Sequence, residues 1–235
     1  MSRIVIASIL AATAFPAMGF DLLGSDAMSG RVQTDAYSYD LDVSNSDNDL
    51  LTASLFTQLP MAVASAADSQ GGPGSANASL SGSRVMNGVL ASGSTVASAS
   101  GFSDGGSGAS GVSEFEFSFT LSGDADFVLD WEFMGGGLLV TGVSEVSLVG
   151  PGNAVIFFQD HGTFGTISGQ ASGMLGAGAY TLHAMSMSSA SGGASGGEGA
   201  DASFSIGFSV VPAPGAGALL GLAGVIGVRR RRAGF

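Results

Sequence analysis

The sequence predicts an all-β protein: an antiparallel, jelly-roll-like β-sandwich flanked by an N-terminal signal-peptide helix and a C-terminal hydrophobic helix. Three observations lead to this prediction. Apolar and polar residues alternate over several short stretches, which is typical of strands with one buried face. Glycine accounts for 39 of the 235 residues, and Gly, Asn and Asp punctuate the alternating stretches as turns do. Each apolar face needs a partner layer, so the strands should form two packed sheets.

The clearest alternation lies in residues 114–121 (EFEFSFTL) and 127–133 (FVLDWEF). Between them, residues 122–126 (SGDAD) have the composition of a turn, so we predict a β-hairpin with its aromatic side chains on one side. Similar patterns predict further strands at residues 37–43, 143–149, 154–159, 180–184 and 204–210.

The small-residue stretches are harder to assign. Residues 68–112 are mainly Ser, Ala and Gly, which suits either low-propensity strands or a flexible insert. We expect weak strands at residues 76–84 and 88–100, with loops at 70–74 and 103–111. Residues 189–200 should be a flexible connection. Residues 50–66 are the stretch outside the two chain ends that could be helical.

The N-terminal nineteen residues have the three parts of a secretory signal peptide. Met1-Ser2-Arg3 is a short positive region, residues 4–15 are apolar, and Ala17-Met18-Gly19 supplies the small residues that signal peptidase reads. Cleavage after Gly19 would leave residues 20–210 as the sandwich domain. The alternative is an uncleaved anchor, although the apolar run is short for a membrane span.

Residues 211–235 form a second tripartite segment. Val211, Pro212 and Pro214 make a stiff motif, residues 215–228 are apolar, and Arg229, Arg230, Arg231 and Arg232 follow. At 1.5 Å per residue the apolar run spans roughly 21 Å, against about 30 Å of hydrocarbon, so we expect transient insertion with the arginines stopping translocation. A buried helix of a soluble protein is the alternative.

This segment resembles the PEP-CTERM sorting signal, which the membrane protease exosortase recognises in Gram-negative and related bacteria. Ala213 stands where the Pro-Glu-Pro motif has glutamate. The resemblance, limited to residues 211–235, implies an exported protein with a membrane-inserted precursor, processed near Pro214 and displayed at or released from the cell surface. It also implies signal peptidase, an exosortase-like protease, the membrane and extracellular polysaccharide of a matrix or biofilm as partners.

Composition limits the partners of the mature domain. The chain has no cysteine, so no disulfide can form. Its seven basic residues are all arginine, and residues 20–210 keep two of them, Arg31 and Arg84, against nineteen carboxylates, a formal charge of −17. Such a surface repels nucleic acid and anionic lipid and favours cations.

The sequence offers little catalytic chemistry, and we predict no enzyme activity. His161 and His183 are the two imidazoles, without HExxH-like spacing, and His183 falls on the polar-facing positions of the strand predicted at 180–184. No serine stands in a Gly-x-Ser-x-Gly elbow. Glu114, Glu116 and Glu132 could meet across the predicted hairpin as a glycosidase pair. A solvated polar face is the favoured interpretation, because all three occupy the polar positions of the alternation.

An acidic run offers the best candidate ligand site. Asp40, Asp42, Asp47 and Asp49 place oxygen ligands where a strand passes into a loop, which would suit calcium. The run departs from the EF-hand pattern at positions 45 and 51, so any site would be looser, with Asp124 or Asp126 contributing. The alternative is an acidic loop that needs only water.

Two functions remain open from the sequence. The first is a noncatalytic cell-surface or extracellular-matrix protein. The second is a secreted carbohydrate-binding module, in which exposed Trp131, Tyr37 or Tyr39 would stack on sugar rings. The alternation groups these aromatic residues with the buried set, which favours the first function.

Overall fold

The computed structural model of the chain describes residues 27–39, 44–53, 62–66, 74–85, 87–100, 106–136, 141–162, 164–193 and 196–212. Within these ranges the chain forms β-strands and one short 3-10 helix, η1 (Pro151–Asn153). The strands are β1 (Ala27–Tyr39), β2 (Ser44–Ala53), β3 (Ala62–Ala66), β4 (Gly74–Val85), β5 (Gly88–Ala99), β6 (Gly106–Leu121), β7 (Ala125–Gly136), β8 (Thr141–Gly150), β9 (Ala154–His161), β10 (Gly165–Leu175), β11 (Gly178–Gly192) and β12 (Glu198–Pro212).

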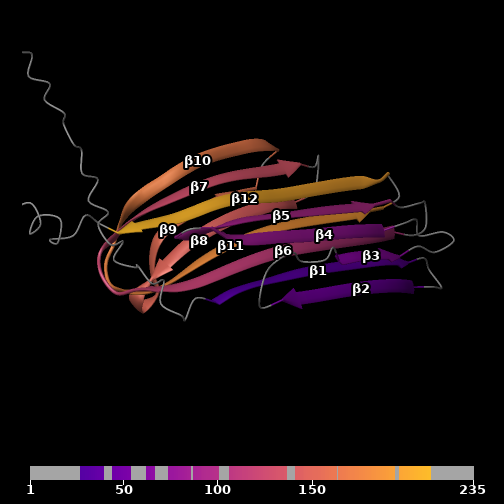
Figure 1. Ribbon diagram of the computed structural model, residues 1–235. Coiled ribbons are helices and arrows are strands. Elements are labelled where there is room, and N and C mark those ends of the chain that lie inside the picture. Colours follow the sequence, from indigo (N-terminus) through magenta and orange to yellow (C-terminus); the bar gives the residue numbers. More distant parts are fainter. Residues whose placement is uncertain are drawn as a thin grey trace, which may run out of the picture.

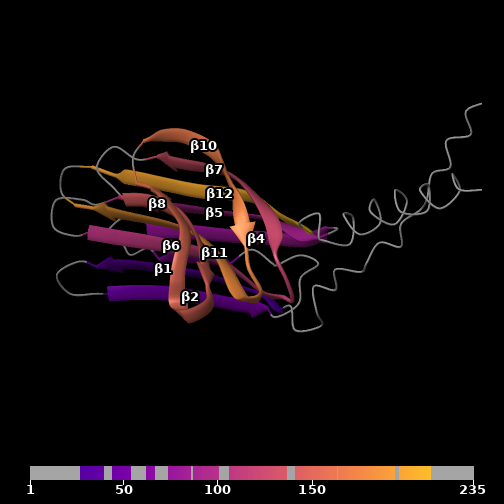
Figure 2. The same ribbon diagram turned by 90° about the vertical axis from the view of Figure 1, so that its left-hand side faces the viewer.

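The strands form two six-stranded sheets that pack face to face (Figure 1). Sheet A has the order β2-β1-β6-β11-β8-β9, and sheet B has the order β10-β7-β12-β5-β4-β3. All pairings are antiparallel. Across the sandwich, β6 lies over β4 and β5, and β11 lies over β5 and β12 (Figure 2). The predicted antiparallel β-sandwich is confirmed.

Strands β5 to β12 pair in a nested order. β8 pairs with β9, β7 with β10, β6 with β11, and β5 with β12. The chain therefore behaves as one long antiparallel ribbon whose two arms run from β5 to β8 and from β9 to β12. Rolling this ribbon brings β12 beside β7 and β11 beside β8, which is the strand order of a jelly roll. Strands β1 to β4 extend both sheets on one side.

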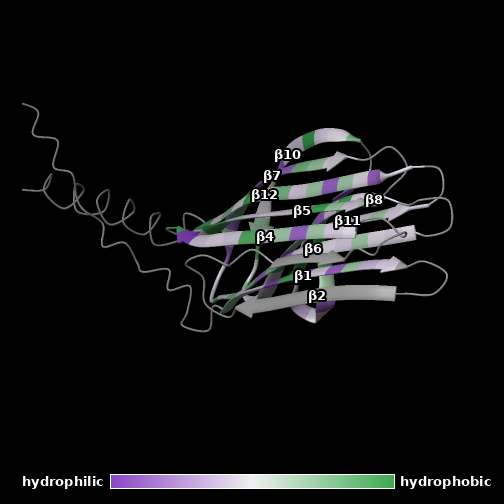
Figure 3. Cartoon of the chain, turned by 90° about the vertical axis from the view of Figure 1, so that its right-hand side faces the viewer, coloured by the Kyte–Doolittle hydropathy of each residue, from purple (hydrophilic) through white to green (hydrophobic). Residues whose placement is uncertain are grey.

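One half of the sandwich, here called the wide half, has an aromatic and aliphatic core. It lies toward the crossover between β6 and β7, and its phenylalanines meet across the two sheets: the rings of Phe119 in β6 and Phe208 in β12 are 5.2 Å apart. Figure 3 shows hydrophobic and hydrophilic residues alternating along strands such as β12. The largest fully buried side chains are Phe115, Phe117, Phe119, Phe133, Phe204, Phe208, Leu121, Leu129, Leu148, Leu175, Leu182 and Val32.

The other half, here called the narrow half, has a core of small residues. Its buried cluster consists of Ala36, Ala76, Ala97, Ala99, Ala109 and Ala190. Here the two backbones almost touch: a Cβ atom added to Gly74 in β4 would lie 2.6 Å from the carbonyl oxygen of Gly108 in β6. Sheets in sandwiches are usually about 10 Å apart. The abundant Ala, Gly and Ser therefore allow the sheets to approach closely in this half.

The predicted hairpin of residues 114–133 is wrong. Both strands exist, but β6 belongs to sheet A and β7 to sheet B. The residues between Leu121 and Ala125 cross from one sheet to the other instead of closing a hairpin. Across the core, β6 packs against β4 and β5, and β7 lies opposite β8, so each apolar strand face is buried against the other sheet.

Other boundaries also differ from the sequence-based expectations. The weak strands at 76–84 and 88–100 are confirmed as β4 and β5, but the expected loop at 103–111 is wrong because β6 begins at Gly106. The strand expected at 37–43 ends at Tyr39, and the possible helix at 50–66 is strand at 50–53 and 62–66. In the expected flexible stretch 189–200, β11 continues to Gly192 and β12 begins at Glu198. Small residues form strands here because the opposing sheet is near enough to bury them.

The predicted signal peptide, residues 1–19, and the apolar C-terminal run lie outside the described residues. Within the described residues, no helix has the length and apolar character needed to cross a membrane. The last described strand, β12, continues to Pro212, two residues past the expected end of the sandwich domain at 210.

Candidate functional site

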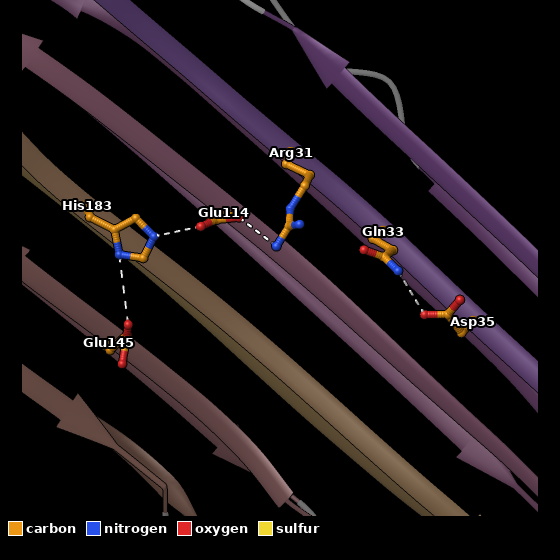
Figure 4. A network of polar contacts seen from close by, with 6 residues as sticks. All are labelled: Arg31, Gln33, Asp35, Glu114, Glu145 and His183. Carbon is orange, nitrogen blue, oxygen red and sulfur yellow. Dashed lines mark hydrogen bonds and ion pairs between the residues drawn. The ribbon is translucent and has the colours of Figure 1, made fainter.

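A row of charged side chains crosses the outer face of sheet A. Arg31, Glu114, His183 and Glu145 come from the four neighbouring strands β1, β6, β11 and β8, and each occupies an outward-facing position (Figure 4). One guanidinium nitrogen of Arg31 is 2.8 Å from Oε2 of Glu114. Nε2 of His183 is 3.0 Å from Oε1 of Glu114, and its Nδ1 is 3.8 Å from Oε1 of Glu145. The imidazole thus lies between two carboxylates.

This row is a surface network of one Arg–Glu ion pair and two contacts between His183 and glutamate side chains. Its side chains are between 23% and 45% exposed, so water screens the charges, and each such pair contributes about 0–1 kcal/mol. In the described part of the chain, no group of three or more His, Asp or Glu residues is arranged to hold a metal ion. The contacts within this row can orient the two carboxylates.

The outer face of sheet B carries a shallow groove lined by hydroxyl groups. The groove has a volume of about 440 Å³, and it is bordered by serines of β4, β5 and β12 and by Glu132 of β7. Ser79 and Ser94 share a hydrogen bond of 2.8 Å, as do Ser81 and Ser92. The groove is open to solvent and presents hydroxyl groups at the regular spacing of the sheet, with one carboxylate at its side.

The groove continues toward the edge of sheet B. A neighbouring depression of about 530 Å³ is bordered by Asp130, Glu132, Ser168 and Gln170. Nε2 of Gln170 donates a hydrogen bond of 2.6 Å to Oδ1 of Asp130. This side of the molecule therefore combines neutral hydroxyl and amide groups with two carboxylates.

The three glutamates that could have formed a glycosidase pair do not meet. Glu114 and Glu116 lie on the outer face of sheet A, whereas Glu132 lies on the outer face of sheet B, so the whole sandwich separates them. The expectation that these three glutamates could converge depended on the hairpin and is wrong for the same reason. Their placement on polar, outward-facing positions agrees with the favoured interpretation.

The predicted sugar-stacking aromatic residues lie in different surroundings. Trp131 is partly buried on the inner face of sheet B, where its ring stacks on Phe133 with a centroid distance of 5.1 Å. Its indole Nε1 is buried without a hydrogen-bond partner. Tyr37 is 48% exposed and lies over Gly108 of the neighbouring strand. Of the three, Tyr37 presents a ring to solvent, and the side chain of Tyr39 lies outside the described residues.

The acidic run is divided by the chain reversal between β1 and β2. Asp40 and Asp42 lie outside the described residues, and Asp47 and Asp49 belong to the edge strand β2. The register places Asp47 beside Ala36, which pairs with Ala109, about 40 Å along β6 from the crossover that contains Asp124. Asp124 therefore cannot share an ion with Asp47, and calcium binding by the aspartates of the run stays a prediction.

The two histidines differ in role. His161 ends β9 and is buried, with Nε2 3.1 Å from the carbonyl oxygen of Gly165. That contact ties β9 to the start of β10 and gives His161 a structural position. His183 lies on the polar face that the alternation predicted for it. The partners Arg31 and Glu145 were not predicted, because only the strand register brings Arg31 to Glu114 and Glu145 to His183.

The predicted sorting motif begins inside the fold. Val211 and Pro212 are the last two residues of β12, where they pair with Asp126 and Ala125 of β7, and Val211 is 54% exposed. Pro214 and the four arginines Arg229, Arg230, Arg231 and Arg232 lie outside the described residues. Both ends of the described sandwich lie at the crossover between β6 and β7, because Ala27 pairs with Ser118 and Pro212 pairs with Ala125.

Comparison with known proteins adds no family. No family model matches the sequence, and no curated protein is similar to it. Among solved structures, the chain is similar to a chain in the structure of infectious bursal disease virus, Gx strain, with 8% identity and a TM-score of 0.21. The match covers 80% of this chain and 61% of the viral chain. It is also similar to the enzymatically active domain of tailspike protein 4 of bacteriophage CBA120, at 10% identity and a TM-score of 0.19, covering 57% and 19% of the two chains. The chain thus spans less than two thirds of either protein.

Proposed function

We propose that this protein is an exported, noncatalytic surface protein whose sandwich is presented on the C-terminal segment and processed there by an exosortase-like protease. The arrangement of sorting motif and fold supports this proposal. Val211 and Pro212 finish β12, and the residues from Ala213 onward follow the last paired position of sheet B. A protease acting near Pro214 would therefore cut just beyond the folded body, without opening the sandwich.

The observation that carries the proposal is that both chain ends leave the sandwich on the same side. The signal peptide precedes Ala27, and the sorting segment follows Pro212, and these two residues lie at the same end of the sandwich. A protein attached to a membrane through either end would present the narrow half outward, roughly 50 Å away along the sixteen residues of β6. The formal charge of −17 on residues 20–210 would keep such domains soluble and separate from anionic lipid.

Mass spectrometry of the protein isolated from its native host tests the proposal. We expect an N-terminus after Gly19 and a C-terminus near Pro214. Pro212→Ala and Pro214→Ala should separate the two roles of the motif: Pro212 belongs to β12, whereas Pro214 lies beyond it. The second variant should leave the fold intact and accumulate uncut precursor.

A matched pair of truncations controls for folding. A chain ending at Pro212 keeps all of β12 and should be released as a folded soluble domain, whereas a chain ending at Ile206 removes pairs with both β5 and β7 and should unfold. A native protein that still ends at Phe235 would show that the segment is a plain anchor and would refute the processing.

A second candidate function is carbohydrate binding on the groove of sheet B. The row of serine hydroxyls beside Glu132 favours it, whereas the position of Trp131 inside the sandwich does not. A glycan array probed with the protein decides this, with Ser81→Val and Ser94→Val as variants that fill the groove. Binding that survives both changes would place the sugar elsewhere.

A further inference from the structure

Each sheet ends in two edge strands, and three of the four carry a feature that blocks pairing with another chain. Edge strands expose unpaired N–H and C=O groups, and natural proteins protect them with charges, bulges or short length. The edges of sheet A are β2, which contains Asp47 and Asp49, and β9, which contains Asp160 and pairs with a bulge between Leu148 and Val149. In sheet B, β3 has five residues.

The fourth edge, β10, has none of these features. It is eleven residues long and contains no charged residue and no proline. It pairs with β7 residue for residue from Gly165 to Leu175 without a bulge. Within the described residues, β7 is its one strand partner, so its other side is free for a further strand (Figure 1).

The two faces of β10 define what can pair with it. Toward the core it places Ile167, Ala171 and Leu175 between glycines, and toward solvent it places Thr166, Ser168, Gln170, Ser172 and Met174. A matching strand must be apolar on one face and neutral on the other. β10 itself meets this requirement.

We propose that β10 pairs antiparallel with β10 of a second copy of this chain, on a two-fold axis at Gln170, so that the two sheets B become continuous. This register pairs each larger core-facing side chain with a glycine: Ile167 with Gly173 and Leu175 with Gly165 of the second copy. On the outer face it pairs Ser168 with Ser172. Cross-strand serine pairs already occur in this sheet, as between Ser79 and Ser94.

The strong negative charge of the protein does not oppose this contact. The nearest carboxylates on the outer face, Asp126, Asp130 and Glu132, belong to β7, one strand in from the edge. Across the paired edge, the β7 strands of the two copies are three strand spacings apart, about 14 Å. That distance exceeds the Debye length of about 8 Å at physiological ionic strength, so the repulsion is largely screened.

Cysteine cross-linking of the full chain tests the register, because the natural sequence has no cysteine. Residues directly opposite in an antiparallel pair have Cα atoms roughly 5 Å apart, within disulfide range. Gln170→Cys should give a disulfide-linked dimer on oxidation. Thr166→Cys alone should not, whereas Thr166→Cys combined with Met174→Cys should. Ser205→Cys, on the outer face of the central strand β12, is the control for random collision.

Charge substitutions in the Gln170→Cys background test the contact energetically. Ser168→Lys with Ser172→Lys would place like charges opposite each other in the dimer, and we expect the cross-linked fraction to fall roughly tenfold. Ser168→Lys with Ser172→Glu would place opposite charges there and should restore the dimer. The two variants share the lysine opposite Glu132 of β7, so they differ only at position 172.

Circular dichroism of each variant should show an unchanged strand spectrum. Equal cross-linking of Gln170→Cys and Ser205→Cys, or equal dimer yields for the two charge variants, would overturn the proposal. So would a Gln170→Cys chain that stays monomeric on oxidation.

Discussion

The hydroxyl of Ser113 in sheet A donates a hydrogen bond of 2.8 Å to the backbone carbonyl oxygen of Ser79 in sheet B. A side chain as short as serine can bridge two sheets only where they lie unusually close. The hydroxyl of Ser144 makes an equivalent bond of 3.0 Å to the carbonyl oxygen of Ser203. Between these two serines, on β11, lies Ser186, whose buried hydroxyl has no partner.

These three serines provide a matched test of hydrogen bonds between the sheets. Ser113→Ala and Ser144→Ala should each lower the free energy of unfolding by about 1 kcal/mol, because each removes a bond that a buried carbonyl accepts. Ser186→Ala should be neutral or stabilising, since it removes an unsatisfied buried hydroxyl. Chemical denaturation of the three variants measures this, and equal losses in all three would contradict the assignment.

The close approach of the sheets makes Gly74 sensitive to any side chain. Gly74→Ala would place a methyl group 2.6 Å from the backbone oxygen of Gly108 and 2.9 Å from that of Tyr37. The backbones would have to separate, so we expect a loss of about 1–3 kcal/mol. Gly123→Ala is the control, because no atom lies within 4 Å of its added Cβ, and its unfolding free energy should stay within about 0.5 kcal/mol. Thermal unfolding of both variants checks the difference.

The wide half supplies most of the apolar burial, which a pair of phenylalanines can test. Phe115 is fully buried in β6, whereas Phe158 in β9 is 53% exposed. Phe115→Asp should unfold the protein, because an unpaired buried carboxylate costs several kcal/mol in a domain of marginal stability. Phe158→Asp should leave the circular dichroism spectrum of a strand-rich fold unchanged. A folded Phe115→Asp variant would contradict the core described above.

The buried phenol of Tyr180 should make the stability of the folded protein fall at alkaline pH. Burial raises the pKa of Tyr180 above its ordinary value of 10, and nearby Asp124 raises it further. The folded protein therefore keeps the phenol proton at a pH where the unfolded chain loses it. This contribution is complete below about pH 10 and is lost as pH rises through the folded value. The melting temperature should fall above about pH 10, and it should fall less steeply in Tyr180→Phe.

A matched comparison separates titration from the lost hydrogen bond in that experiment. The hydroxyl of Tyr180 donates a 2.8 Å bond to the carbonyl oxygen of Gly176, so Tyr180→Phe should lower stability at neutral pH. The slope above pH 10, and not the value at neutral pH, reports the titration. Parallel curves for the two proteins would refute this role of Tyr180.

Hydrophobic alternation was sufficient to predict several of the strands but not their partners. Residues 114–121 and 127–133 were assigned correctly because every second residue is large and apolar. The turn between them has the same composition whether it closes a hairpin or crosses between sheets, so the pairing could not be read from it. Strand β10 was not predicted, because its core-facing positions are largely glycine and alanine. A glycine has no side chain that would mark the buried face of a strand. The buried face of β10 can be recognised only from the side chains that cover its glycines, as Trp131 covers Gly169.

The charged row on sheet A shows the same limit for candidate sites. The polar face of His183 was predicted from its strand, yet Glu114 and Glu145 lie 69 and 38 positions away in the sequence. Only the registers of β6, β8 and β11 bring them within reach of one imidazole. The alternation along a strand predicts the sheet face on which a residue lies. Its neighbours on that face depend on which distant strands pair beside it.

The nested pairing also determines when the sandwich can form. Because β12 lies between β7 and β5, a chain that stops before it leaves sheet B as two separate pieces. A chain that crossed a membrane from its N-terminus would deliver β12 last, together with Val211 and Pro212, which are the final two residues of that strand. The central hairpin β8–β9 can close early, since its loop is short, but the pairing of β5 with β12 must wait for the final residues. If the protein is exported as we propose, folding of sheet B would be completed only after almost the whole chain has crossed the membrane, and until then the chain would remain unfolded enough to pass.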